Sequence, residues 1–312
     1  MIMDDELACQ SYHVLNEYFS SNPSDGHVRS GENLARYTSM GCGGRADFFC
    51  DVYSYQGLRT IIRFCIENDI PYRLLGYGTD ILVSDKGVRG VVIRLMGDVF
   101  WSVKELGGNR LRVGSRVGLR KIIAVTTSLG LSGAEWLMGI PASLGGAVSL
   151  NAGAYGRRIA DIIEDVTVYI PSDDTKKTFN RDELLFEYRR GPFYNNEIIL
   201  ESTLKFEPGK PEDIRAKSEA IIRTRKQKLP EGKSAGCVFK NPQQISAGAL
   251  IEMAGLKGRT LSGAMVSERH ANIVINKEHA HSDDIITLIK EIQDTVERSQ
   301  GIHLDLEIKI WS

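Results

Sequence analysis

The chain has 312 residues, of which 42% are hydrophobic and 25% are charged, and its formal net charge is -1. This length allows two or three domains with sizeable cores, and the near-zero charge excludes a protein that holds nucleic acid or anionic lipid through a general basic surface. The five cysteines contain no C-x-x-C pair, which argues against a disulfide framework or a zinc knuckle and favours the reducing cytoplasm.

The amino-terminal segment predicts a helix and then a linker. Acidic side chains at positions 4–6 stand where a secretory signal needs positive charge, and no window approaches ~18 uninterrupted apolar residues, so we expect neither secretion nor membrane insertion. Apolar and aromatic residues recur at helical spacing over 7–19, which predicts a packing helix. Residues 20–31 are polar and rich in turn formers, and we expect a linker there.

The next segment predicts a helix over 58–66, ended by Asn68, and a short strand over 72–75. The strand runs into G-Y-G-T-D-I-L-V, which starts like a dinucleotide-binding fingerprint. Leu82 or one of its neighbours stands in the place of the third glycine, so a nicotinamide-binding Rossmann unit is not expected. The segments G-V-V-I-R-L, V-F-W-S-V and R-L-R-V-G then predict a β-rich stretch with a subdomain boundary near residue 100.

A helix predicted over 119–129 leads to a stretch rich in glycine and alanine, residues 133–156. Glycine weakens ordinary helices and strands, so its density here indicates that something approaches this backbone closely. Amide N–H groups exposed in turns and at helix starts would suit a diphosphate. A tightly packed turn region without a ligand is the alternative reading of the same composition.

The second half predicts two strands, 163–170 and 198–206, with an exposed hairpin turn at D-D-T-K-K-T. The run P-G-K-P at 208–211 breaks the pattern and indicates a domain boundary. After it we expect a helix through Ile214 and Ile222, a short helix over 247–254, a final amphipathic helix from Ser282, and a closing strand H-L-D-L-E-I-K-I-W.

The glycine-rich stretch contains the sequence G-I-P-A-S-L-G-G-A-V-S-L-N-A-G-A-Y-G. This sequence resembles the flavin-binding core of UDP-N-acetylenolpyruvoylglucosamine reductases, which make UDP-N-acetylmuramate for bacterial peptidoglycan. Further motifs follow the family's order: Y-T-S-M-G-C-G-G-R-A-D-F-F, G-Y-G-T-D, E-Y-R, A-G-C-V-F-K-N-P and the terminal L-x-L-E-I. The resemblance runs from about Tyr37 to Ile310. Only a strand and one helix lie between Tyr188 and Gly236, which is similar to the shorter (type II) branch.

The resemblance implies an α+β fold, a two-subdomain FAD-binding fold of the vanillyl-alcohol-oxidase/PCMH type with a C-terminal α/β substrate-binding domain. The implied segments are an amino-terminal helix and linker, two FAD-binding subdomains and the substrate-binding domain, at 1–34, 35–100, 101–208 and 209–312. It also implies FAD as the cofactor and NADPH as the electron donor, with UDP-N-acetylglucosamine enolpyruvate as the substrate. The implied cofactor-binding residues are Gly76, Gly78, Thr79, Asp80, Gly139, Ile140, Pro141, Ser143, Gly145, Gly146, Asn151, Ala152 and Gly153. Thr79 and Asp80 depart from the family's usual Ser and Asn.

The implied catalytic residues are Arg189, Cys237 and Glu307. Taken alone, each residue suits an ordinary role: Arg189 as a solvated surface arginine, Cys237 as a small buried thiol, and Glu307 on the solvent-exposed face of a strand. In the family, Arg189 and Glu307 would stabilise the enolate-like intermediate that forms when reduced flavin passes hydride to the vinyl carbon. Cys237 would donate the proton. It stands where most of the family has Ser, and a thiol, with an ordinary pKa of about 8.5, is a better acid than an alcohol.

Arg225 and Lys228, from R-x-x-K-L-P, and Asn241, from K-N-P, are the implied substrate contacts; the alternative for the two cations is a solvated helix face. His279 and His281 lack partners at metal-ligand spacing, and no metal is expected. We further expect a monomer that binds neither nucleic acid nor membrane. Two alternatives stay open: an FAD-dependent oxidase of the same fold, which would not need Arg225 and Lys228, and a flavin-binding paralogue without catalysis, suggested by Asp80 and Cys237.

Overall fold

The computed structural model describes residues 5–193 and 195–312, and the chain divides into two compact units. The first unit takes in the chain up to Arg29, Phe49–Gly76 and Val91–Arg225, and the second takes in Ser30–Phe48, Tyr77–Gly90 and Lys226–Ser312. The chain therefore enters the second unit three times. The four segments predicted from the sequence divide the chain differently, and they stay a prediction.

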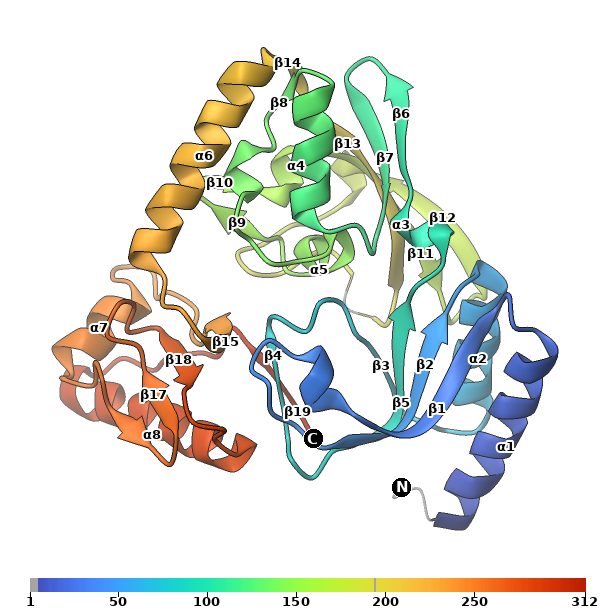
Figure 1. The fold of residues 1–312 in the computed structure, drawn as a ribbon, viewed down its shortest axis with the longest axis horizontal. Helices are drawn as coiled ribbons and strands as arrows, with labels where there is room; N and C mark the ends of the chain where they lie inside the picture. Colours follow the sequence, from blue (N-terminus) through green and yellow to red (C-terminus); the bar gives the residue numbers. More distant parts are fainter. Residues whose placement is uncertain (1–4, 194) are drawn as a thin grey trace. The chain divides into compact units, whose positions relative to one another are not determined.

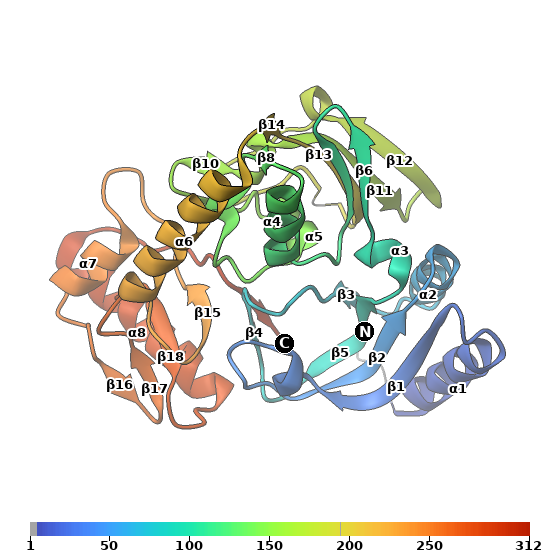
Figure 2. The same cartoon turned by 45° about the horizontal axis from the view of Figure 1, so that its top comes forward.

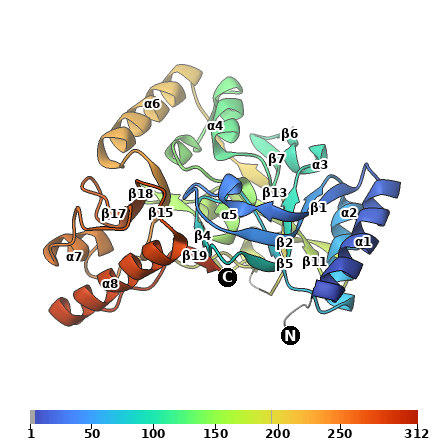
Figure 3. The same ribbon diagram turned by 60° about the horizontal axis from the view of Figure 1, so that its bottom comes forward.

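The first unit begins with two helices, α1 (Asp5–Ser21) and α2 (Tyr55–Glu67), which lie side by side in all three views (Figures 1, 2 and 3). The Ser54 side chain accepts a hydrogen bond from the Gly57 amide, which caps α2 at its start. The predicted helical stripe of α2 is buried at Leu58, Ile61, Ile62 and Cys65 but exposed at Ile66, and Asn68 ends the helix as expected. The predictions for 7–19 and 58–66 are thus confirmed.

A four-stranded sheet has the order β1-β2-β5-β3. Its strands are β1 (Gly26–Asn33), β2 (Arg45–Val52), β3 (Tyr72–Leu74) and β5 (Val88–Leu95), and the division between the units falls inside β1, β2 and β5. Part of the predicted linker is thus a strand, and that prediction was wrong. Val28 is the one strongly apolar side chain of β1, so pairing within the sheet, and not hydrophobic alternation, makes this segment a strand.

The larger part of the first unit is a five-stranded antiparallel sheet of order β12-β11-β13-β7-β6. Its strands are β6 (Val103–Gly107), β7 (Arg110–Gly114), β11 (Ile163–Ile170), β12 (Thr175–Asn180) and β13 (Ile198–Lys205). The predicted strands over 163–170 and 198–206 and the hairpin between β11 and β12 are confirmed. The segment V-F-W-S-V is not one strand, because residues 98–101 form a helical turn, α3 (Asp98–Trp101), that buries Phe100.

Two helices cover this sheet, α4 (Leu119–Ser128) and α5 (Leu144–Ser149) (Figure 1). Ile122 and Ile123 of α4 and Val148 of α5 share one buried cluster with Val166 and Val168 of β11. The remaining short elements of this unit are β8 (Leu131–Ser132), β9 (Gly153–Ala154), β10 (Arg157–Arg158), β14 (Glu207–Pro208) and the 3-10 helices Glu135–Leu137, Ile159–Asp161 and Arg181–Glu183.

The second unit contains a four-stranded sheet of order β15-β18-β17-β16 and a parallel pair, β4-β19. The strands are β4 (Ile81–Val83), β15 (Lys233–Cys237), β16 (Thr260–Leu261), β17 (Ala264–Val266), β18 (Ile273–Asn276) and β19 (Lys309–Trp311), and a 3-10 helix spans Leu34–Tyr37. Helices α7 (Ala247–Met253) and α8 (Ser282–Gln300) pack beside β17 and β18 (Figure 3). The closing strand is shorter than predicted, because only its last three residues pair with β4.

Helix α6 (Pro211–Lys228) begins at the predicted boundary and continues from the first unit into the second. Proline suits the first position of a helix, where its missing N–H is no loss, and Glu212 and Asp213 in the first turn suit the positive end of the helix dipole. In the described part of the chain, no helix has the length and apolar character that crossing a bilayer requires.

Candidate active site

A cavity of about 140 Å³ lies in the first unit at the start of α5. Three predicted cofactor-binding glycines line it, Gly76, Gly145 and Gly146, together with Ser143. A side chain on Gly76 or Gly146 would lie 3.3 or 3.4 Å from the Ser143 hydroxyl oxygen. The absence of side chains here keeps the cavity open, and the cavity is large enough for one part of a dinucleotide rather than the whole.

The amide groups of this turn already have partners inside the protein. Leu144 and Gly145 donate to the carbonyl oxygens of Val117 and Ser115, each at 2.8 Å, and Gly146 donates to the Ser143 hydroxyl at 3.3 Å. The amides of Gly145 and Gly146 therefore donate within the protein, and their role in binding a diphosphate stays a prediction. Their contribution is close access to the backbone, because no Cβ blocks the approach.

Two buried polar atoms near this turn lack a hydrogen-bond partner among the described residues. They are the Ser115 hydroxyl, which lines the cavity, and the Asn151 side-chain carbonyl oxygen, whose residue is 2% exposed. A buried polar group without a partner is costly, so such atoms indicate a missing ligand or water. A nucleotide cofactor, with hydroxyl, amide and phosphate groups, fits this donor and acceptor set.

Two other predicted cofactor-binding glycines, Gly139 and Gly153, are close to protein and not to this cavity. Gly139 has a φ of +81°, and a Cβ there would lie 2.9 Å from Cδ of Arg225. A Cβ on Gly153 would lie 2.8 Å from the carbonyl oxygen of Arg157. The positive φ of Gly139 and the main-chain contact of Gly153 favour glycine here even without a ligand, which agrees with the alternative reading of the stretch, and a cofactor-binding role for these two residues stays a prediction. Ile140, Pro141 and Ala152 also lie outside the cavity lining.

Arg189 lies in a tight turn that the glycine-rich segment holds in place. Asn151 donates from its side-chain nitrogen to the carbonyl oxygen of Glu187 at 2.8 Å, and Gly191 donates to the carbonyl oxygen of Ser149 at 2.9 Å. Arg189 itself has a φ of +55°, a conformation that non-glycine residues rarely adopt. Strain of this kind is typical of functional positions, where the surrounding contacts enforce it.

In the second unit, Gly78 packs against the segment that begins at Tyr37. A Cβ on Gly78 would lie 2.0 Å from the Tyr37 carbonyl oxygen, and the Ser39 amide donates to the Gly78 carbonyl oxygen at 2.9 Å. Asp80 accepts a hydrogen bond on its main-chain oxygen from the Lys309 amide at 3.0 Å. The two predicted motifs Y-T-S-M-G and G-Y-G-T-D therefore pack against each other. The carboxyl-terminal strand is hydrogen-bonded to the second motif at Asp80.

Cys237 and Glu307 lie on neighbouring backbone segments of the second unit. The Glu307 amide donates to the carbonyl oxygen of Val238 at 2.8 Å, and an isolated bridge joins Phe239 to Leu306. Gly236, with a φ of +78°, forms a bulge in β15 just before Cys237. Both predicted catalytic side chains are half-buried. The structure thus brings together two residues that lie far apart in the sequence.

The predicted substrate contacts differ in their surroundings. Arg225 is half-buried on α6, and its Nε atom lacks a hydrogen-bond partner among the described residues, whereas Lys228 is exposed at the end of α6. The Asn241 side-chain oxygen accepts a hydrogen bond from the Ala247 amide at 3.0 Å, which helps to position the start of α7. Asn241 therefore has a structural role in addition to any contact with substrate.

Sequence reasoning missed several residues that line the cavity. They are Leu74, Leu75, Leu95, Ser115, Arg116, Ser149, Glu197, Ile198 and Ile199. Arg116 donates to the Gly76 carbonyl oxygen at 2.7 Å and so helps to fix the turn at Gly76. The signal for Ser115 and Arg116 was the polar pair directly after the strand R-L-R-V-G, at a position where strands commonly deliver functional side chains.

Two family models match the chain. Residues 46–178 match the FAD binding domain, and residues 227–311 match the UDP-N-acetylenolpyruvoylglucosamine reductase, C-terminal domain. The fold class predicted from the sequence is thereby confirmed.

Full-length relatives agree with the two family models. The UDP-N-acetylenolpyruvoylglucosamine reductase of Syntrophus aciditrophicus is 40% identical over 304 residues, which are 95% of this chain and 97% of the relative. The enzyme of the same name from Halalkalibacterium halodurans is 36% identical over 287 residues, 91% of this chain and 94% of the relative. The crystal structure of the reductase from Thermus caldophilus superposes with a TM-score of 0.79 at 35% identity, over 92% of this chain and 99% of that one.

Proposed function

We propose, from the premise that the chain belongs to the UDP-N-acetylenolpyruvoylglucosamine reductase family, that it reduces UDP-N-acetylglucosamine enolpyruvate to UDP-N-acetylmuramate with electrons from NADPH. Gly76, Ser143, Gly145 and Gly146 of the cavity at α5 would hold FAD, which would supply hydride transfer from NADPH to the vinyl carbon of the substrate. The cavity beside Gly76, Gly145 and Gly146 and the unpartnered Ser115 hydroxyl support FAD binding by the first unit.

Three side chains of this protein would act on the reacting atoms. Arg189 would hold the substrate carboxylate, on which negative charge increases, because its planar guanidinium can donate two hydrogen bonds to one carboxylate. Glu307 would stabilise the same intermediate, and Cys237 would protonate the carbon next to the carboxylate. The Sγ–H bond breaks, a C–H bond forms, and the thiolate then regains a proton from solvent.

The observation that carries these assignments is the hydrogen bond from the Glu307 amide to the Val238 carbonyl oxygen. It fixes the proposed acid, Cys237, and the proposed carboxylate on adjacent backbone segments, as a shared role in one reaction requires. The strained φ of Arg189, held by Asn151, supports a functional position for the third group.

Arg225 and Lys228 would bind the uridine diphosphate of the substrate, and Asn241 would add a contact. The unpartnered Nε of Arg225 supports this proposal, because a half-buried guanidinium nitrogen without a partner favours a bound anion. An oxidase of the same fold would not need these two cations. We also propose that the enzyme acts in the cytoplasm as a monomer.

A two-step anaerobic experiment tests the function. NADPH is added to the oxidised, FAD-loaded protein, and the substrate is added once the yellow absorbance has bleached. We expect bleaching in the first step and recovery of the colour in the second. Bleaching that only oxygen reverses would identify an oxidase, and a bound flavin that NADPH does not bleach would identify a paralogue without this activity.

A further inference from the structure

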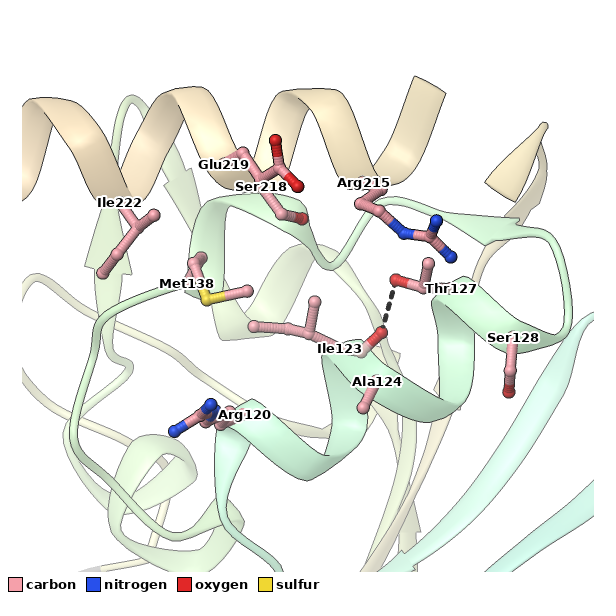
Figure 4. Close-up of a pocket in the computed structure, with 10 residues that line it drawn as sticks. All are labelled: Arg120, Ile123, Ala124, Thr127, Ser128, Met138, Arg215, Ser218, Glu219 and Ile222. Atoms are coloured by element: carbon pink, nitrogen blue, oxygen red, sulfur yellow. Dashed lines mark hydrogen bonds between the residues drawn. The ribbon is translucent and has the colours of Figure 1, made fainter. Parts of the chain in front are cut away.

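A second cavity, of about 350 Å³, lies in the first unit between α4 and α6, and it shares no lining residue with the cavity at α5 (Figure 4). It is lined by Arg120, Ile123, Ala124, Thr127, Ser128, Met138, Arg215, Ser218, Glu219 and Ile222. Its volume falls at the lower end of the ~300–1,000 Å³ that is typical of small-molecule sites. Nothing in the proposed reaction uses it.

Ser218 is the polar side chain in the interior of this cavity. It is 4% exposed, and its hydroxyl has no hydrogen-bond partner among the described residues. A serine inside a helix usually donates to the carbonyl one turn earlier, as Thr127 does here to the Ile123 carbonyl oxygen at 2.7 Å (Figure 4). Ser218 instead turns its hydroxyl towards the space between the two helices, where a ligand atom could accept from it.

The rim of the cavity carries two arginines. Arg120 and Arg215 have no carboxylate within ion-pair distance in the described part of the chain, and the rim carboxylate, Glu219, lies 3.8 Å from Arg223 on the same helix. Arg215 and Ser218 are three positions apart, so they share one face of α6. The rim therefore favours an anion, and a carboxylate at this end could contact both residues.

Most of the remaining lining is apolar, and its two other hydroxyls, of Thr127 and Ser128, already donate to the Ile123 and Val125 carbonyl oxygens. Ile123 is 2% exposed, and Met138 and Ile222 are half-buried on either side of the cavity. Burying a short hydrocarbon chain against these three side chains removes apolar surface from water on both partners. The lining thus combines an apolar floor, one hydroxyl donor and a positive rim.

We propose that this cavity binds a small amphipathic anion, a carboxylate on a short aliphatic chain. The carboxylate accepts hydrogen bonds from the Ser218 hydroxyl and the Arg215 guanidinium, and the chain lies against Ile123, Met138 and Ile222. Arg120 adds positive potential from the other end of the cavity. The proposal concerns a site of its own and does not depend on the proposed function.

Equilibrium dialysis of the full-length, FAD-loaded protein with radiolabelled octanoate tests the site, with octanamide as the uncharged probe of the same shape. We expect one octanoate per chain and binding about tenfold weaker for octanamide, because charge-assisted hydrogen bonds are about twice as strong as neutral ones. Arg215→Met should lower octanoate affinity to the octanamide level and leave octanamide unchanged. Lys226→Met, an exposed position on the same helix and outside the lining, should change neither.

Ser218→Leu should abolish binding of both probes, because the larger side chain occupies the space beside Arg215 where the polar head group of each probe would lie. It should also raise the unfolding temperature, since it replaces an unpartnered hydroxyl with apolar contacts. The absence of octanoate binding to the wild-type protein would overturn the proposal and leave the cavity as a packing defect. Equal octanoate affinity in wild type and Arg215→Met, an exposed position whose change leaves the fold intact, would overturn it as well.

Discussion

The Glu307 amide donates a hydrogen bond to the Val238 carbonyl oxygen at 2.8 Å, so the segment that carries Glu307 lies against the residue that follows Cys237. A carboxylate and a thiol on adjacent segments can act on one substrate carbon and its neighbouring carboxylate. Gly236 makes this possible, because its φ of +78° forms the bulge that redirects the chain just before Cys237.

Replacing Cys237 separates the two halves of the reaction. Flavin reduction by NADPH involves no protonation of the substrate carbon next to the carboxylate, so Cys237→Ala should bleach normally in stopped-flow measurements. Its turnover should fall by ~10² to 10⁴, the usual contribution of a general acid. Cys237→Ser should keep substantial activity, because it restores a donor. Full turnover in Cys237→Ala would exclude the thiol as the acid.

The alkaline side of the pH–rate profile adds a second test of the same residue. Thiols ionise in the alkaline range and aliphatic hydroxyls do not, so wild-type turnover should fall with rising pH while Cys237→Ser stays flatter. Identical alkaline limbs would assign the pH dependence to another group. The buried thiols do not confuse this result, because burial raises the pKa of Cys42 to about 11 and that of Cys65 to about 12.

Arg189→Lys should slow the second half-reaction alone. Lysine keeps the positive charge but loses the planar pair of donors, so reduced flavin should reoxidise about a hundred- to a thousandfold more slowly with substrate, as when a comparable preorganised donor is removed. Arg190→Lys is the matched control, since Arg190 is exposed and pairs with Glu187 at 3.2 Å. Reoxidation of Arg189→Lys at the wild-type rate would remove Arg189 from the mechanism.

Sequence patterns predicted the elements whose side chains alternate between core and solvent. The stripe of Leu58, Ile61 and Ile62 predicted α2 within three residues at its start, and the apolar alternation over 163–170 predicted β11. The pattern failed where tertiary contacts decide the structure. β1 has a single strongly apolar buried side chain, and residues 98–101 form a helical turn in a segment of strand-forming residues.

Motif resemblance gave the candidate residues, but it could not say which contacts each makes. Gly139 and Gly145 look alike in the sequence, yet one packs against Arg225 and the other lines the cavity. Ser115 carries no motif, and its place in the cavity follows from the pairing of β7 with β13, a long-range contact. The polar pair Ser115 and Arg116 after this strand indicates a functional position, but local sequence does not show which distant segments lie beside it, so this part of the site required the structure.

Arg225→Ala and Lys228→Ala should mainly raise the KM for the substrate. A diphosphate distant from the reacting carbon is held equally in the ground and transition states, so kcat should change little. A hydrogen bond to a charged group contributes about 1.5–3 kcal/mol to binding, so the loss of each one should raise KM by about tenfold to a hundredfold. Steady-state kinetics measure both constants.

Arg223→Ala serves as the control for this pair. Arg223 lies on the same helix, is exposed, and pairs with Glu219 at 3.8 Å. Its removal should leave both constants near wild type. A large fall in kcat with unchanged KM in Arg225→Ala would contradict a role in ground-state binding.

Asp174 should make the stability of the first unit depend on pH in the acid range. Arg59 on α2 donates from Nε to both carboxylate oxygens, at 2.6 and 2.8 Å, and Tyr169 donates at 3.0 Å. The hydrogen bonds from Arg59 are the main reason that the pKa of Asp174 is lowered to about 2. The ion pair between Arg59 and Asp174 joins α2 to the turn between β11 and β12, and this turn lies far from α2 in the sequence.

The sign of the effect follows from the lowered pKa. The unfolded chain has an aspartate pKa of about 3.9, so the ionised carboxylate stabilises the folded state fully above that value and the contribution is lost as pH falls towards 2. Asp174→Asn should therefore be less stable than wild type at pH 6, and the difference should shrink between about pH 4 and pH 2. Urea unfolding of both proteins between pH 6 and pH 2 measures this difference in the free energy of unfolding. Glu67→Gln, which removes the exposed pair with Arg63, should change stability little at any pH. A difference between wild type and Asp174→Asn that stays constant from pH 6 to pH 2 would show that the charge of Asp174 does not stabilise the fold.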